Sequence, residues 1–411
     1  PGGHKMTKQA NGIRSIFVYP WDLIDAGVEK SLEDVRRMGF NHISLAVAYH
    51  SGKFLLPHNP KKTVYYHPSG LVYFTPRTEH YGLLRPLPAD ACGESPKQER
   101  AKATKDSLQA ITEAARNKGL QVRAWIVGTH NSRLGRRHPE HAITNLNGEV
   151  YYHGLCPSHA ETKHYLLQVV RDLLDQYDLA ALDLESFDFT GMLHGDHHEI
   201  VGIPHAEVAE RILGLCFCSA CTRKARDNGI DADELKTQLR QLLEQLFRLE
   251  DSERLLGTLA GLSLYTDYLA MRQRIVEDIV AGVRNEVDER GGSVALHSTY
   301  WIYGGADPSL YGTSAERLSQ YLDGWIVCYP RSPDEVGRFV ERARWDMPSN
   351  MHLSGGVRAL YPELSEPSDV GKYFSAYADS GICDYHVYNY GLASQAVLEQ
   401  ISACMSKTSG E

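Results

Sequence analysis

Two carboxylates stand two residues apart, at Asp183 and Glu185, in an otherwise apolar segment that begins at Ala180. The apolar residues indicate a buried strand, and residues two apart in a strand point to the same face. A carboxylate inside a sheet or barrel is costly unless it is paired, hydrogen-bonded or used in chemistry. We therefore predict that this strand delivers Glu185 to an active site. Asp183 either supports Glu185 or forms a structural pair with a neighbouring strand.

A cysteine cluster is the second group of residues that could do chemistry. Cys216, Cys218 and Cys221 have the spacing Cys-x-Cys-x-x-Cys. Three thiolates at this spacing can converge on one tetrahedral zinc ion, and Cys156 is the preferred fourth ligand, with Cys92 next. Four thiolates leave no open coordination position, so we expect a structural zinc and no organic cofactor. Reduced cysteines that only pack in the core are the alternative.

Composition excludes several classes of protein. The chain has 411 residues, a net charge of −9 and a pI near 6.1, which argues against nucleic acid as a partner. No apolar segment is long enough for a membrane span. Eight cysteines do not suggest a disulfide framework, and their clustering favours a cytoplasmic location. Residues 1–6 resemble an expression scar, and a signal peptide could have been removed before Met6, so localisation is left open.

The rest of the chain alternates between strand-like and helix-like segments. We predict strands at 14–20, 41–49, 121–127, 180–185, 293–296, 324–327, 351–353 and 383–388. A helix pattern follows each of them, among them 28–38, 106–118, 160–176, 314–322, 334–344, 368–378 and 394–405. Eight such units predict an α/β fold, the TIM (β/α)8 barrel. The first strand lacks the Gly-rich turn that is usual in an open doubly wound sheet.

Two long segments interrupt this alternation. The first, at about 51–97, is rich in proline and tyrosine, and the second, at about 191–290, is mostly helical and follows the fourth strand. We interpret both as insertions in a single catalytic domain that covers 7–411. The helical insertion could also form the surface of a homo-oligomer.

Aromatic and polar residues are expected at the carboxyl ends of the strands, where such barrels bind their ligands. Aromatic planes beside hydrogen-bonding groups suit a sugar. The predicted substrate-binding residues are Trp21, His50, His130, Asn131, Arg133, His297, Tyr300, Trp301, Tyr329, Arg358, His386, Tyr388 and Asn389.

Cleavage of a glycosidic bond needs an acid to protonate the departing oxygen and a second group to stabilise or attack the sugar. Glu185 is the predicted acid, since burial at a strand end can keep a carboxyl protonated near neutral pH. The second group is left open between Asp183, Asp22, Asp188 and Asp384.

Three segments together resemble uncharacterised glycoside-hydrolase-like TIM-barrel families: 156–158 (Cys-Pro-Ser), 181–186 (Ala-Leu-Asp-Leu-Glu-Ser) and 215–221, which holds the three cysteines. The last segment is also similar to the zinc cluster of family 42 β-galactosidases. The resemblance implies a carbohydrate substrate, with Glu185 as general acid/base. The chain departs from the common retaining pattern after its seventh strand, where Leu353-Ser354-Gly355 stands and the nucleophilic Glu is missing.

Two other functions are considered. His50, His130, Glu185, His297 and His386 could hold a divalent cation, as in a metal-dependent sugar isomerase, epimerase or lyase. The missing seventh-strand carboxylate also fits a barrel that binds saccharide without cleaving it.

Overall fold

A computed structural model of the chain describes residues 12–89, 106–193, 200–301 and 307–408. Within these ranges the side chains of Tyr300 and Trp301, and of 407–408, are not described. The predicted expression scar at 1–6 and the alternative zinc ligand Cys92 lie outside the described residues.

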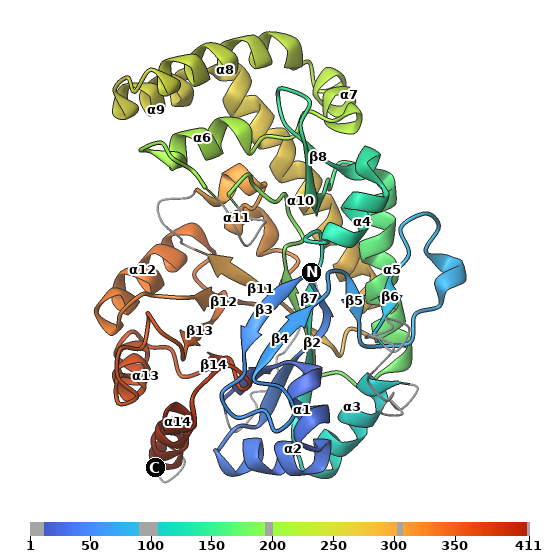
Figure 1. Cartoon of the computed structure of the whole chain (residues 1–411), viewed down its shortest axis with the longest axis vertical. Coiled ribbons are helices and arrows are strands. Elements are labelled where there is room, and N and C mark those ends of the chain that lie inside the picture. Colours follow the sequence, from blue (N-terminus) through green and yellow to red (C-terminus); the bar gives the residue numbers. More distant parts are fainter. Residues whose placement is uncertain (1–11, 90–105, 194–199, 302–306, 409–411) are drawn as a thin grey trace.

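Eight parallel strands form a closed barrel (Figure 1). The barrel closes because β1 pairs with both β14 and β2. In sheet order the strands are β1 (Arg14–Val18), β14 (Tyr385–Tyr388), β13 (His352–Arg358), β12 (Gly324–Cys328), β11 (Ala295–Trp301), β10 (Ala181–Glu185), β7 (Gln121–Val127) and β2 (His42–Tyr49). The predicted TIM (β/α)8 barrel is confirmed.

Helices surround the barrel and cover the outer face of its strands. They are α1 (Pro20–Ala26), α2 (Val28–Arg37), α3 (Ser107–Asn117), α5 (Ala160–Gln176), α10 (Ser263–Glu289), α11 (Ala315–Leu318), α12 (Val336–Asp346), α13 (Asp369–Asp379) and α14 (Gln395–Thr408). The helix α2 ends at Arg37, close to the predicted end at 38, and is followed by Gly39, whose φ of +95° suits glycine best. The segment 314–322 holds a much shorter helix than predicted.

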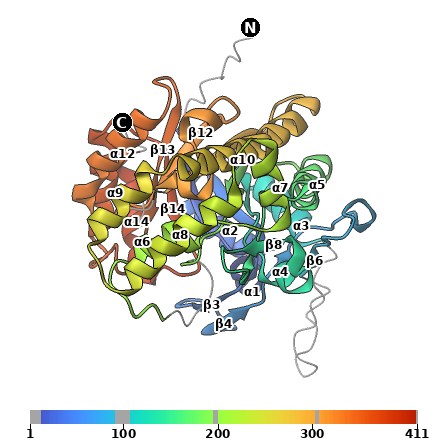
Figure 2. The ribbon, with the colours of Figure 1, turned by 90° about the horizontal axis from the view of Figure 1, so that it is seen from above.

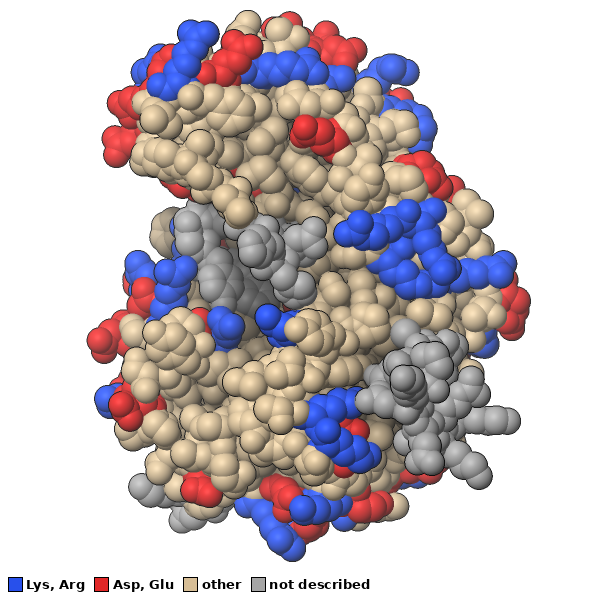
Figure 3. All heavy atoms as spheres, viewed as in Figure 1, with Lys and Arg blue, Asp and Glu red and all other residues tan. Residues whose placement is uncertain are grey.

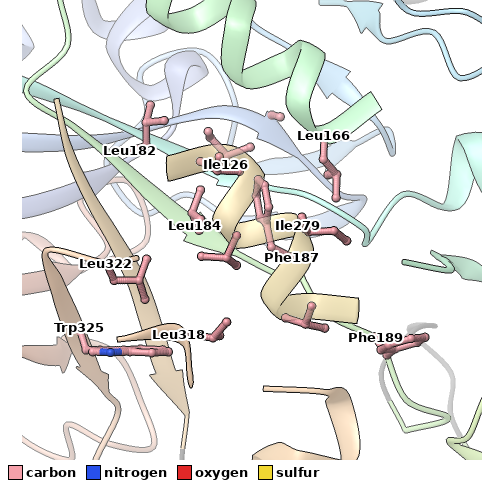
Figure 4. Close-up of a cluster of buried hydrophobic side chains, with 14 of the residues drawn as sticks. Ile126, Leu166, Leu182, Leu184, Phe187, Phe189, Ile279, Leu318, Leu322 and Trp325 are labelled. Carbon is pink, nitrogen blue, oxygen red and sulfur yellow. The ribbon is translucent and has the colours of Figure 1, made fainter. Parts of the chain in front are cut away.

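The side chains of β10, the strand that carries Asp183 and Glu185, point alternately to the two faces of the barrel wall. Leu182 and Leu184 point outward and are fully buried against the surrounding helices. Figure 4 shows both in one cluster of buried side chains with Leu166 of α5 and Ile279 of α10. Removing this apolar surface from water stabilises the wall, by about 1.5–3 kcal/mol for each leucine. The alternate residues of β10, which include Glu185, therefore face the inside of the barrel.

The seventh barrel strand, β13, corrects the prediction. The sequence predicted a strand at 351–353 that ends at the glycine pair, but β13 continues through both glycines to Arg358. The ring of Tyr377 lies so close that a Cβ on Gly355 would meet it at 2.8 Å. Glycine here allows a helix side chain to approach the strand, and does not mark a turn.

The fifth barrel strand, β11, is also longer than predicted. The sequence placed it at 293–296, whereas it runs from Ala295 to Trp301. His297 is therefore the third residue of the strand and pairs with Asp183 and Gly324 of its neighbours. This register places His297 inside the barrel and away from the strand end.

Several short elements were not predicted. Two antiparallel hairpins extend from the barrel, β3 (Gly52–Leu55) with β4 (Val64–His67) and β8 (Ala142–Thr144) with β9 (Val150–Leu155). The remaining short elements are β5 (Leu71–Val72), β6 (Leu87–Pro88), α4 (Ser132–Arg137), η1 (Thr78–His80), η2 (Pro139–His141), η3 (Pro308–Tyr311) and η4 (Pro333–Glu335).

A helical segment lies between β10 and β11, as predicted from its apolar spacing. Its described helices before α10 are α6 (Ala206–Leu213), α7 (Ser219–Asp227), α8 (Ala232–Phe247) and α9 (Ser252–Gly261). Figures 1 and 2 show these helices together at one end of the molecule, with α10 running from them along the barrel. Ion pairs join α10 to α5, at 2.7 Å between Lys163 and Asp278. Self-association through this segment stays a prediction.

Candidate active site

A cavity of about 340 Å³ opens at the carboxyl ends of the barrel strands. Strand ends of β2, β7, β10, β13 and β14 meet there, together with the first strand of the β3–β4 hairpin. Its lining consists of Tyr49, His50, Ser51, Gly52, Lys53, Phe54, Trp125, Glu185, Tyr329, Arg358 and Tyr388. Among these residues Glu185 is the one carboxylate.

Backbone hydrogen bonds to the two residues that follow β7 fix the position of Glu185. The amide of Gly128 donates to the carbonyl of Glu185 at 2.9 Å, and the amide of Thr129 donates to that of Ser186 at 2.7 Å. Ser186 has a φ of +53°, in the left-handed region that non-glycine residues rarely adopt. The chain therefore turns sharply after Glu185, and such backbone strain is typical of functional sites.

The carboxyl group of Glu185 has a strongly altered acidity. Burial raises its pKa to about 7 by disfavouring the charged form. The indole N–H of Trp125 donates to Oε2 at 2.6 Å, which lowers the pKa, and the nearby Asp188 raises it. Burial outweighs the indole contact, so Glu185 can hold a proton near neutral pH, as a general acid must.

Phenol groups form a fixed wall on one side of the cavity. The hydroxyl of Tyr19, which is fully buried, lies 2.8 Å from the hydroxyl of Tyr49 and 2.7 Å from that of Tyr388. The imidazole of His50 stacks on the ring of Tyr49, with a centroid distance of 4.3 Å. Aromatic faces beside hydroxyl groups can pack against the apolar face of a sugar ring and hydrogen-bond its edges.

Two cationic side chains, Lys53 and Arg358, also line the cavity. Arg358 donates from Nη1 to Oε1 of Glu363 at 2.9 Å, and that carboxylate is almost completely buried. Glu363 is outside the cavity lining, so it orients the guanidinium from behind.

Asp183, predicted as a catalytic partner or support, lies inside the barrel below the cavity. It accepts two hydrogen bonds from the guanidinium of Arg123, from Nε at 3.0 Å and from Nη2 at 2.5 Å. The hydroxyl of Ser44 donates to it as well, at 2.9 Å. A fully buried carboxylate with a bidentate arginine fits the structural pair that the sequence analysis left open.

Asp22, the other predicted catalytic acid, is in α1 and is not among the cavity-lining residues. It is almost completely buried, and this burial raises its pKa to about 8. It packs against Gly391, where a Cβ would lie 1.8 Å from Oδ2. Its neighbour Trp21 is also buried outside the lining and stacks on Tyr19 at 4.3 Å.

Three predicted residues after β7 lie behind the cavity wall. His130 stacks on His50, with a centroid distance of 4.3 Å and an interplanar angle of 14°. The side chain of Asn131 accepts a hydrogen bond from the amide of Leu134 and so caps the helix α4. Arg133 donates to the carbonyl of Arg85 at 3.0 Å.

The remaining predicted residues divide between the cavity and the barrel interior. His50, Tyr329, Arg358 and Tyr388 line the cavity. Three others are buried and do not line the cavity, namely His297, His386 and Asn389. The two histidines lie before the ends of their strands, and Asn389 follows the end of β14. Burial lowers the pKa of His297 and of His386. The side chains of Tyr300 and Trp301 lie outside the described residues.

The sequence analysis missed Trp125 and the hairpin residues Lys53 and Phe54. Trp125 could have been found from the alternation of β7, since it pairs with Asp183 and its side chain points to the same inner face. The hairpin had no comparable signal, because nothing local shows which way a loop folds over a barrel.

The four cysteines expected at the metal site are brought together in a buried cluster. Cys156 precedes α5, whereas Cys216, Cys218 and Cys221 lie at the start of α7. The sulfur of Cys156 is 3.5 Å from that of Cys221 and 3.6 Å from each of the other two. Tetrahedral zinc with bonds of about 2.3 Å would separate its sulfurs by about 3.8 Å, so the cluster fits a metal ion closely.

Donors around the cluster are suited to thiolates. The amide of Thr144 donates to the sulfur of Cys216 at 3.3 Å. The hydroxyl of Ser158 lies 3.0 Å from the sulfur of Cys221, and Nε2 of His159 lies 3.3 Å from that of Cys218. Such outer contacts orient metal ligands and stabilise their charge.

The molecular surface carries charges of both signs (Figure 3). On the face shown in Figure 3, basic side chains share the surface with acidic ones, and a hollow opens between the helical segment and the barrel. In the described part of the chain, no helix combines the length and the apolar character needed to cross a bilayer.

The fold is similar to that of several solved glycoside hydrolases. An α-L-fucosidase isoenzyme 2 from Paenibacillus thiaminolyticus matches 97% of this chain and 49% of its own, at 13% identity and a TM-score of 0.59. The PgaB (BpsB) glycoside hydrolase domain from Bordetella bronchiseptica matches 96% of this chain and 98% of its own, at 12% identity and a TM-score of 0.58. A β-galactosidase from the psychrophilic Marinomonas ef1 matches 96% of this chain and 59% of its own, at 10% identity and a TM-score of 0.57.

These similarities concern the fold alone, because the sequence identities are low. The chain spans about half the length of the fucosidase that it matches. A scan against protein-family models finds no match, and neither does a search of curated proteins. The structure therefore defines a TIM (β/α)8 barrel with a buried four-cysteine cluster, and its fold is similar to that of the glycoside hydrolases named above.

Proposed function

We propose that this chain is a glycoside hydrolase in which Glu185 is the general acid/base. The observation that carries the proposal is a strand-end carboxyl with a pKa of about 7 as the one acid among the residues lining an aromatic cavity. The proton of Glu185 would pass to the glycosidic oxygen as its bond to the sugar breaks. Water would complete the reaction by adding to the sugar carbon and giving one proton to the Glu185 carboxylate, which restores the acid.

The second catalytic group is not Asp183 in this proposal, because Arg123 and Ser44 already use its carboxylate. Asp22 is also a poor choice, since it lies outside the cavity lining. An acetamido or similar group of the substrate could take this part. The wall of tyrosines would hold the sugar.

The test compares Glu185→Gln with the wild type on a panel of aryl glycosides. Gln keeps the size of the side chain and cannot donate a carboxyl proton, so we expect the rate of any cleaved glycoside to fall by about 10²–10⁴. Glu113→Gln, on the exposed face of α3, is the matched control and should keep full activity. Full activity of Glu185→Gln would contradict the assignment.

A barrel that binds saccharide without cleaving it is the second possibility. The observation in its favour is that the described lining offers one carboxylate where glycosidases commonly use two. Binding in a glycan array with no turnover in the aryl-glycoside panel would support it. For a metal-dependent sugar enzyme the described residues offer no specific support, because their two groups of metal-binding side chains lie outside the cavity lining.

We also propose that the four-cysteine cluster binds one structural zinc ion. Cys156, Cys216, Cys218 and Cys221 supply four sulfurs, so no position remains for a substrate or a water. The resemblance of this segment to the zinc cluster of family 42 β-galactosidases supports the choice of metal. The ion would join the loop before α5 to the start of α7.

A further inference from the structure

A second group of potential metal ligands lies beside the cysteine cluster. His141 ends η2, His159 immediately precedes α5, and Glu161 is in the first turn of that helix. One ligand atom from each lies within 4.8 Å of the others. We propose that these three side chains bind a second divalent cation of the zinc class. None of the three residues lines the cavity, so the inference does not depend on the proposed activity.

The imidazole of His141 supports the site most directly. Its Nδ1 atom is buried and has no hydrogen-bond partner among the described residues. A buried polar nitrogen without a partner is costly, and an ion would supply the missing bond. Nδ1 faces Oε2 of Glu161 at 3.8 Å, while Nε2 faces Oε1 of Glu140 at the same distance. A carboxylate behind the second ring nitrogen is the usual arrangement for a metal-bound histidine.

His159 connects this site to the cysteine cluster. Its Nε2 atom contacts the sulfur of Cys218 at 3.3 Å, so Nδ1 can bind an ion without breaking that contact. Its ring is almost perpendicular to that of His141, with a centroid distance of 4.9 Å. If the Cys218 sulfur is a metal-bound thiolate, it favours the tautomer with the proton on Nε2. Occupancy of the cysteine cluster should therefore strengthen binding at the second site.

The three ligand atoms, which lie within 4.8 Å of one another, must move closer together to bind one ion. Zinc bonds to nitrogen and oxygen are about 2.0–2.2 Å long, so tetrahedral ligands lie about 3.3–3.5 Å apart. The separation of 3.8 Å between His141 and Glu161 is slightly larger. The Glu161 side chain is 45% exposed and can move toward the ion, whereas both imidazoles are held by the core. Two histidines and one glutamate leave a fourth position for water.

The experiment is metal analysis of the full chain after loading with zinc and removal of excess ion. We expect two zinc ions per chain in the wild type and one in Glu161→Gln or His141→Gln. His138→Gln is the matched control, since His138 is near Glu140 but outside the set, and it should keep two ions. Glu161→Gln alters a partly exposed side chain, and an unchanged circular dichroism spectrum would show that it folds.

Cobalt distinguishes the two sites, because thiolate ligands give intense charge-transfer absorption and imidazole or carboxylate ligands do not. The cysteine cluster should produce that absorption, and a second equivalent should bind without adding to it. Cys216→Ser should remove the absorption and weaken the second equivalent at least tenfold. The proposal fails if the wild type binds one ion, or if Glu161→Gln and His141→Gln leave the affinity for the second ion unchanged.

Discussion

The indole N–H of Trp125 donates to Oε2 of Glu185 at 2.6 Å, across the pair of strands β7 and β10. Glu185 pairs with Val127, so Trp125 belongs to the layer of side chains below it. The contact stabilises the ionised carboxylate, while burial favours the protonated form and prevails. The acidity of Glu185 is thus the balance of two neighbouring structural features, and each of them can be altered separately.

Removing the indole donor should make Glu185 less acidic. The acid form of Glu185 is lost as the pH rises through its pKa of about 7, so kcat/KM should fall on the alkaline side with that midpoint. In Trp125→Phe the hydrogen bond that lowers the pKa is gone, and the midpoint should move up by about one pH unit. The protonated carboxyl band in infrared difference spectra gives the same midpoint without substrate. An unshifted midpoint in both measurements would contradict this prediction.

Asp183 should matter for stability. In Asp183→Asn the guanidinium of Arg123 loses its counter-charge in the barrel interior, where both side chains are at most 2% exposed. Breaking a buried pair from one side costs about 3–5 kcal/mol, to be measured by urea unfolding. The control Asp178→Asn changes a side chain that is 74% exposed and should stay within about 0.5 kcal/mol of the wild type. Equal stability of the two variants would show that the pair is not structural.

Asp22 should make the protein less stable at higher pH. Its folded pKa of about 8 lies above its ordinary value, so between about pH 4 and 8 the folded state keeps a proton that the unfolded state has released. The free energy of unfolding then falls by up to about 1.4 kcal/mol per pH unit in this window. Asp22→Asn removes the effect. Urea unfolding should show that the free energy of unfolding of the variant rises relative to that of the wild type between pH 5 and pH 8. The same difference in free energy of unfolding at both pH values would contradict this prediction.

The cysteine cluster should contribute to stability through its metal. Cys216→Ser should lower the zinc content by one ion per chain and lower Tm by about 5–10 °C, since binding energy at such a site adds to folding energy. Cys383 is exposed and outside the cluster, so Cys383→Ser is the control. Metal analysis and thermal unfolding by circular dichroism test both statements. An unchanged zinc content in Cys216→Ser would mean that this ion binds elsewhere.

Local patterns in the sequence were enough to predict much of the fold. The patterns that predict strands and helices, with a period of two in strands and near 3.6 in helices, depend only on residues close together in the sequence. One of the wrong predictions, the end of β13, fell where glycine has a tertiary role. Gly355 and Gly356 resemble a turn in sequence, but both continue β13. The ring of Tyr377 occupies the space beside Gly355, and the carbonyl of Val327 occupies the space beside Gly356. A local pattern holds no information about a side chain that arrives from another helix.

The sequence by itself determined the barrel and the inward face shared by Asp183 and Glu185, because alternation along one strand is a local property. Only the tertiary structure decided that Arg123 binds the first acid and Trp125 contacts the second. Those partners follow from the register between β7 and β10, which is set by the packing of the whole barrel wall. Asp183 and Glu185 share a strand, a face and a carboxyl group, but their surroundings differ. Asp183 lies in the closed interior of the barrel, whereas Glu185 borders the cavity.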